Sequence, residues 1–183
     1  MKKIIFSILT LGTLACFSGK LMAQTSATVS ATPAGAVLVI PMTLTQTAPL
    51  HFGTSVLLNA VGGTIQLPSN STTRVYGTPT AVAASAVNPA PTNAAYTVGG
   101  TRLETYSITL PGTTTVTAPS GTVKTMDITL MKAWVNSASG EATTGTLDTN
   151  GADHFTLGGT LTVKANQDGG VYSGTFAVTV DYN

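Results

Sequence analysis

The chain has 183 residues, of which 43% are hydrophobic and only 8% are charged, with 19 glycines and 9 prolines. Disordered proteins have low hydrophobicity, so this composition excludes a disordered chain. The chain has eight basic and seven acidic residues, and the basic residues form no Lys/Arg-rich cluster in the sequence. Nucleic-acid binding is therefore not expected.

The first 23 residues have the pattern of a signal peptide. Lys2 and Lys3 give a basic start, residues 4–17 form a short apolar run, and Leu21-Met22-Ala23 ends in a small residue. The run is short for a membrane span, so no span is expected in the mature chain. We predict cleavage before Gln24, which removes Lys20 as well and leaves five basic against seven acidic residues.

Cys16, the only cysteine, lies inside this leader and has two interpretations. It is either an apolar residue of the signal peptide or the lipidated first residue of a lipoprotein. Leu14-Ala15-Cys16 is a partial match to a lipobox, although Thr13 replaces the expected aliphatic residue. With cleavage after Ala23, the mature chain contains no cysteine and forms no disulfide.

The mature chain opens with a small, weakly alternating segment, residues 24–32. Ala27, Val29 and Ala31 share one parity, and Pro33-Ala34-Gly35 follows like a hinge. Residues 24–35 are therefore predicted to be an N-terminal extension, and residues 36–183 a single β-sandwich domain.

Several short strands are expected in the first half of this domain. The predicted strands are residues 36–45 (an edge strand broken by Pro41, with Leu38, Ile40, Met42 and Leu44 on one side), 62–67, 74–76 and 104–110. Residues 78–101 are rich in Ala, Pro, Thr and Asn, and they predict a long loop with one small strand near residues 81–86.

The second half carries a long strand whose inward parity changes. Within residues 123–135, the positions expected to face inward change from Met126, Ile128 and Leu130 to Met131, Ala133 and Val135. This change indicates a bulge or a strand that switches sheets. A turn over residues 148–154 follows, then a strand over 157–165 and a hairpin turn over 167–170 that leads into the final strand. Gly-Gly-Thr recurs at residues 62, 99 and 158, and each copy is interpreted as a turn at the start of a strand.

Residues 171–182 predict one final strand. Tyr172, Phe176, Val178, Val180 and Tyr182 share the face expected to meet the core, and polar residues occupy the other face. Only Asn183 follows. Short strands separated by turn signals, without helical periodicity, predict an all-β, immunoglobulin-like β-sandwich.

Little in the sequence indicates a catalytic site or a ligand-binding site. His51 and His154 are far apart, and no Gly-x-Ser-x-Gly motif occurs. The acidic run 148–153 has the wrong glycine spacing for a calcium loop, and Trp134 is expected in the core rather than on a sugar-binding surface. We expect no catalytic residue, no metal and no cofactor, with an enzyme of unrecognised type as the remote alternative.

The C-terminus resembles that of subunits assembled by the bacterial chaperone–usher pathway. Gly170 is the fourteenth residue from the end and Tyr182 is the penultimate one. The run from Gly169 to Tyr182 is also similar to the C-terminus of the spore coat protein U family. Leu50-His51-Phe52-Gly53, the run Gly158–Val163 and Ala165-Asn166-Gln167 resemble a family of secreted bacterial domains of unknown function, over nearly all of the mature chain.

The resemblance implies a sandwich that lacks its last strand. A periplasmic chaperone and then the N-terminal extension of the next subunit would supply that strand, by addition to an open sheet edge. It further implies an outer-membrane usher, a homo-polymer, and export through the periplasm to the cell surface or an extracellular fibre. Ala27, Val29 and Ala31 would be the donor positions, and Gly170 with the inward residues of the final strand would form the groove.

One alternative stays open at this point. A self-contained secreted sandwich, acting as a matrix or carbohydrate-binding module, would fold residues 24–32 or 36–44 back as its own missing strand. The sequence does not decide whether the N-terminal strand acts within one chain or between two.

Overall fold

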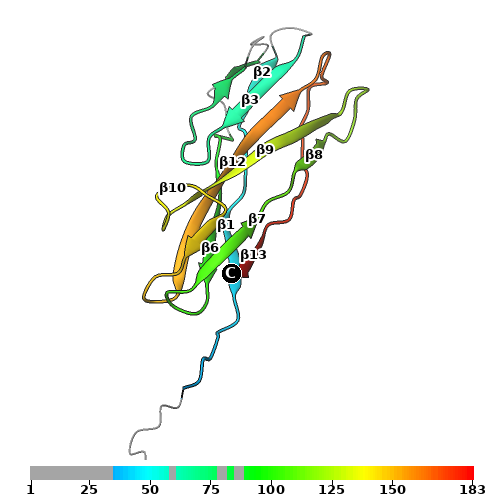
Figure 1. Cartoon of the computed structure of the whole chain (residues 1–183). Helices are drawn as coiled ribbons and strands as arrows, with labels where there is room; N and C mark the ends of the chain where they lie inside the picture. The colour runs from blue at the N-terminus through cyan, green and yellow to red at the C-terminus, as the bar shows by residue number, and fades with distance from the viewer. Residues whose placement is uncertain (1–34, 58–60, 78–81, 85–88) are drawn as a thin grey trace, which may run out of the picture. The chain divides into compact units, whose positions relative to one another are not determined.

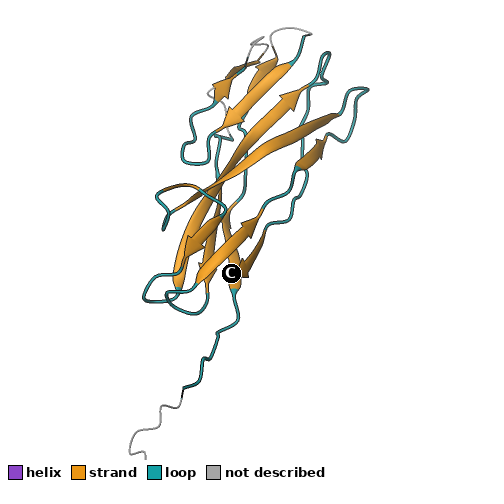
Figure 2. Ribbon diagram, viewed as in Figure 1, coloured by secondary structure: helices purple, strands orange, loops and turns teal. Residues whose placement is uncertain are grey.

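The computed structural model describes residues 35–57, 61–77, 82–84 and 89–183. The predicted signal peptide with Cys16, and the candidate donor positions Ala27, Val29 and Ala31, lie outside these residues. Leu38–Asn183 form one compact unit. The described residues form strands and loops without a helix (Figures 1 and 2). This part of the chain therefore contains no helix long and apolar enough to cross a membrane.

Antiparallel strands form three sheets. The largest contains β1 (Thr43–Ala48), β3 (Gly63–Leu67), β4 (Val75–Tyr76), β6 (Ala94–Gly99), β8 (Thr113–Thr117), β9 (Thr125–Val135), β10 (Gly140–Glu141) and β12 (Ala152–Val163). A second contains β7 (Thr105–Thr109), β11 (Thr144–Thr146) and β13 (Thr179–Tyr182). A two-stranded sheet pairs β2 (Ser55–Leu57) with β5 (Val82–Ala84). The all-β sandwich prediction is confirmed.

β12 is the central strand of the largest sheet. It pairs with β9 from Phe155 to Thr162 on one edge, and its other edge pairs first with β6 and then with β3. β1 extends the sheet beyond β6, and β8 and β10 extend it beyond β9. Because β12 keeps one side-chain parity, a single face of this sheet carries the buried residues from both of its halves.

The half of this face beside β6 is covered by the second sheet. We call its buried cluster the closed core: Ala94, Tyr96, Val98, Tyr106, Ile108, Ala133, Val135, Leu147, Phe155 and Leu157. Tyr96 and Phe155 stack with ring centroids 5.1 Å apart. β7 contributes Tyr106 and Ile108 from the opposite sheet, so this half is a two-layer sandwich.

The other half of the face is built differently. We call its buried cluster the open core: Phe52, Ile65, Leu67, Val116, Met126, Ile128, Leu161 and Val163. Apart from Phe52, these residues come from strands of the largest sheet alone. Leu50, Tyr76, Met131 and Tyr172 pack against it only as partly buried residues. No described strand of the second sheet covers this half.

The parity change in the long strand is a bulge, as predicted. The register between β9 and β12 shifts between Gly158 and Thr160, and Leu130 takes a left-handed φ of 50°. β9 stays in one sheet throughout. The inward assignment of Leu130 was wrong, because the bulge turns its side chain outward and leaves it 72% exposed.

Several predicted boundaries were also wrong. The strand expected over residues 36–45 begins only at Thr43, while β6 and its buried alternation lie within the segment predicted as a loop. The turn over 148–154 gives way to β12 at Ala152. The glycine pair at 158–159 lies inside β12, and Gly99 ends β6, so of the three Gly-Gly-Thr copies only the one at Gly62 precedes a strand.

Candidate functional site

An apolar groove of about 650 Å³ opens over the open core. Its floor consists of core residues themselves: Ile65, Val116, Met126, Ile128, Leu161 and Val163. All six floor residues are themselves buried, with exposed fractions of 2–9%. The second sheet covers the closed core, whereas no described strand of that sheet covers the floor of the groove.

One rim of the groove is residues 50–55, which continue from β1. Arg74 Nη1 donates to the carbonyl oxygens of Phe52 (3.0 Å) and Thr54 (2.7 Å) and to Ser55 Oγ (3.0 Å). The backbone of His51 exchanges hydrogen bonds with Thr92. This rim is thus held from the side away from the groove.

The opposite rim is residues 167–174, and it is fixed in a similar way. The Asp168 carboxylate accepts from Val123 N–H, and the Gln167 side chain donates to the Val123 carbonyl. Tyr172 Oη donates to the Asp168 carbonyl. Because both rims are tied to other parts of the domain, the groove does not depend on contacts between the rims to keep its shape.

The structure places the predicted C-terminal residues along this rim and beyond it. Tyr172, Phe176, Val178, Val180 and Tyr182 are all half-buried, and the residues between them are exposed. Tyr172 packs on the open core, and the other four pack on the closed core. Gly170 lines the groove, with room for a Cβ at 3.4 Å from Ala118.

Only the last four residues of the predicted twelve-residue strand are a strand, so that boundary was wrong. β13 pairs with β7 and not with β12, so the hairpin expected at residues 167–170 was also wrong, and Ser173 alone forms a bridge to Thr117 in β8. The reason lies in the partner: β7 ends at Thr109, Leu110-Pro111-Gly112 interrupts it, and β8 joins the other sheet. Proline offers no N–H to a ladder, so the final segment lacks a regular partner between residues 174 and 178.

The outer edge of this final segment is open. Ser173 and Asn183 donate their backbone N–H to the carbonyls of Thr117 and Thr105, both at 3.1 Å. Alternate residues of an extended chain direct their N–H groups to opposite edges, so those of Phe176, Val178 and Val180 point away from β7. Within the described residues, β13 and β1 each pair on one edge only.

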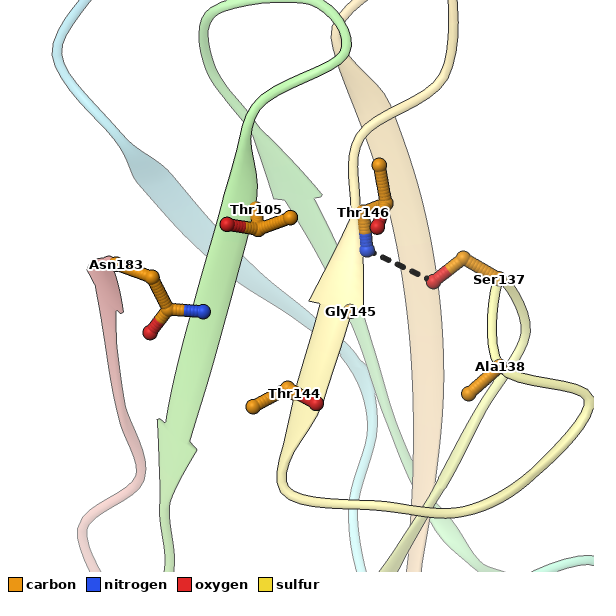
Figure 3. Close-up of a pocket in the computed structure, with 7 residues that line it drawn as sticks. All are labelled: Thr105, Ser137, Ala138, Thr144, Gly145, Thr146 and Asn183. Carbon is orange, nitrogen blue, oxygen red and sulfur yellow. Dashed lines mark hydrogen bonds between the residues drawn. The ribbon is translucent and has the colours of Figure 1, made fainter.

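A second, polar hollow of about 260 Å³ lies beside β11 (Figure 3). Ser137 Oγ accepts from Thr146 N–H at 3.0 Å and donates to the buried carboxylate of Asp153. Tyr106 Oη donates to the same carboxylate at 2.9 Å. Burial, and then the hydrogen bond and charge of Asp153, raise the pKa of Tyr106, so this phenol stays neutral. The hydroxyl groups here are engaged in holding Asp153.

The two carboxylates of the acidic run 148–153, those of Asp148 and Asp153, bind different groups of the protein. Asp148 Oδ1 accepts from the N–H groups of Asn150 (2.8 Å) and Ala152 (2.9 Å), which lowers the pKa of Asp148. Asp153 turns inward to Tyr106. Across the residues that the structure describes, no three His, Cys, Asp or Glu side chains are grouped closely enough to hold a metal.

Sequence reasoning missed the rim at residues 50–55, the Arg74 clamp and the floor residue Val116. Val116 lies in a threonine-rich strand, Thr113–Thr117, whose alternation of buried Thr114 and Val116 was the available signal. Trp134, expected in the core, is half-buried on β9.

Residues 42–182 match a family model described as "Domain of unknown function (DUF4402)". The match spans all of the strands described above. No curated protein and no solved structure matches the chain.

Proposed function

This chain belongs to the DUF4402 family, and we propose that it is a non-enzymatic structural subunit of a bacterial surface fibre. In this proposal, subunits polymerise when a β-strand from one copy enters the groove of the next. The observation that carries the proposal is the uncovered half of the core, floored by Val116, Met126 and Leu161 between two rims.

The free energy available from filling the groove is large relative to domain stability. Each apolar side chain transferred from water to such a floor contributes about 1.5–3 kcal/mol. Three or four of them would approach the ~5–15 kcal/mol that stabilises an ordinary domain. A subunit of this design is marginal alone and stable after a strand has entered.

The open backbone edges support a strand as the occupant. The two rims run in opposite directions. Each pairing from β1 through β6, β12 and β9 to β8 is antiparallel, and so is the Ser173–Thr117 bridge, so these five steps reverse the chain direction an odd number of times. A strand between them would be antiparallel to one rim and parallel to the other, and would satisfy N–H groups such as those of Phe176 and Val178.

The finer parts of the proposal come from the sequence resemblance to chaperone–usher pilins and spore coat protein U. They are export by the signal peptide, a periplasmic chaperone that covers the groove in transit, an outer-membrane usher, and a final location at the cell surface. Residues 24–32, with Ala27, Val29 and Ala31, serve as the donor segment of the neighbouring copy. Asp168 is the only Asp, Glu, Lys or Arg among the residues that line the groove, which fits an uncharged donor.

Removing residues 24–32 tests this proposal. The chain from Gln24 to Asn183 is expected to form oligomers or fibres that grow with protein concentration, as sedimentation velocity and electron microscopy would show. The truncated chain should remain monomeric and melt at lower temperature, because it lacks the donor positions Ala27, Val29 and Ala31.

The alternative outcome is equally clear. If the chain from Gln24 is a stable monomer at millimolar concentration, the fibre proposal fails. Loss of monomer stability on deletion would then favour the self-contained sandwich, a matrix or carbohydrate-binding module whose extension fills its own groove.

A further inference from the structure

Four consecutive aliphatic side chains are exposed just before the first strand. Val37 and Leu38 are each 88% exposed, Ile40 is 58% exposed and Val39 is 52% exposed. They belong to no strand. Single exposed aliphatic residues are normal on a protein surface, but a continuous run of four marks an interaction site.

This run is anchored at the end of the domain that holds the C-terminus. The Ile40 N–H donates to Thr101 Oγ1, and Tyr182 Oη donates to the Ile40 carbonyl, both at 2.6 Å. Tyr182 Oη also accepts from Thr101 N–H at 2.6 Å. The chain upstream of Ile40 therefore starts from a fixed point beside Tyr182.

That fixed point is far from the groove. The floor residue Val116 lies next to Gly174, because a Cβ added to Gly174 would lie 3.1 Å from Val116 Cγ1. Gly174 is eight residues of extended chain from Tyr182, a span of about 26 Å. Val37 is three residues from Ile40 and reaches at most about 11 Å from it. While Ile40 is anchored, the run is therefore too short to reach the groove floor at Val116 in its own domain.

We infer that Val37, Leu38 and Val39 fill the groove of a second copy of this chain. The inference rests on the proposed function and names the part of the strand that occupies the groove over the open core. The run carries no charge and its branched side chains suit a floor made of Val116, Ile128 and Leu161.

The geometry also explains the small residues further upstream. Ala27, Val29 and Ala31 precede Val37 by six to ten residues, or about 20–33 Å of extended chain. A strand entering with its bulky residues over the open core would bring these small residues beside the closed core. That half is already covered by β7 and β13, so little space remains there.

The placement of the two sites predicts the form of the assembly. The C-terminus and the start of β1 lie at one end of the domain in Figure 1, and β2 and β3 lie at the other, beside the groove rim at residues 50–55. The anchored run and the groove are therefore different surfaces at opposite ends of the domain. Such head-to-tail contacts do not close on themselves unless a rotation forms a ring, so they generate a filament.

A triple serine variant tests the inference. Val37→Ser, Leu38→Ser and Val39→Ser together should abolish the concentration-dependent assembly of the chain from Gln24, as sedimentation velocity would show. The melting temperature of the monomer should be unchanged, because these side chains contact little in it. The matched control replaces Ala27, Val29 and Ala31 by serine.

The outcomes separate the two proposals. Assembly lost in the 37–39 variant supports the inference, whatever the control does. Assembly retained in that variant but lost on deletion of residues 24–32 overturns the inference and leaves the fibre function standing. Absence of assembly in the wild-type chain removes the proposed function itself.

A disulfide experiment tests the contact directly. Leu38→Cys in one population and Gly170→Cys in another, both on the chain from Gln24, should form a mixed disulfide when the two are combined under mild oxidation. Thr149→Cys, in an exposed turn, is the control partner and should not trap Leu38→Cys. Equal trapping of both partners, or an intramolecular disulfide in the Leu38→Cys/Gly170→Cys double variant, would overturn the inference.

Discussion

Replacing Gly158 by alanine should destabilise the domain by about 3 kcal/mol, a large part of its total stability. A Cβ on Gly158 would lie 2.2 Å from the Leu67 carbonyl oxygen and 2.6 Å from the backbone of Pro68 and Ser69. These are backbone atoms at the end of β3, so no side chain can move aside. The change would force β3 away from the central strand.

Gly169→Ala is the matched control for this substitution. No atom lies within 4 Å of a Cβ at Gly169, and its φ is outside the left-handed region. Its free energy of unfolding should change by less than about 1 kcal/mol, measured by urea denaturation. Equal stability of the two variants would show that β3 does not pass beside Gly158 as described.

Val178→Asp should lower the free energy of unfolding by about 3–5 kcal/mol and leave little folded protein. Val178 is half-buried and packs on the closed core, so the carboxylate would lose solvation without gaining a partner. Neighbouring Thr179 is exposed, and Thr179→Asp is the control that should fold normally. A cooperatively unfolding Val178→Asp variant with the wild-type urea midpoint would place Val178 on the solvent face.

The alternation of side chains predicted some features correctly because it is a local property. The parity change between Ile128 and Met131 predicted a bulge, and the structure has one at Leu130. The alternation in residues 171–182 matches the half-buried and exposed positions, yet the pairing there is confined to β13. Pairing depends on where the partner strand stops, which the alternation of one strand does not reveal.

Long-range features were not predictable in this way. Gly158 resembles a turn glycine, and only the approach of Leu67, ninety-one positions earlier, shows why a side chain is not tolerated there. β6 was hidden in a segment rich in alanine and proline, although Ala94, Tyr96 and Val98 alternate. The groove lies over one half of a single sheet, and its rims and floor come from segments distant in sequence.

The exposed run before β1 shows a further limit. Its alternating aliphatic residues predicted an edge strand of this domain, with Leu38 and Ile40 on the same side. The structure leaves both exposed and starts β1 at Thr43. A strand pattern records that a segment is suited to pairing, but it does not say with which molecule.

Residue-resolved hydrogen exchange tests the central claim most directly, because alternate amides of the final segment provide an internal control. The chain from Gln24 would be compared as a dilute monomer and after assembly at high concentration. The amides of Phe176, Val178 and Val180, which point to the open edge, should become strongly protected on assembly. Those of Ser173 and Asn183, already bonded to Thr117 and Thr105, should change far less. Equal exchange at Phe176, Val178 and Val180 in the two states would contradict strand insertion between copies.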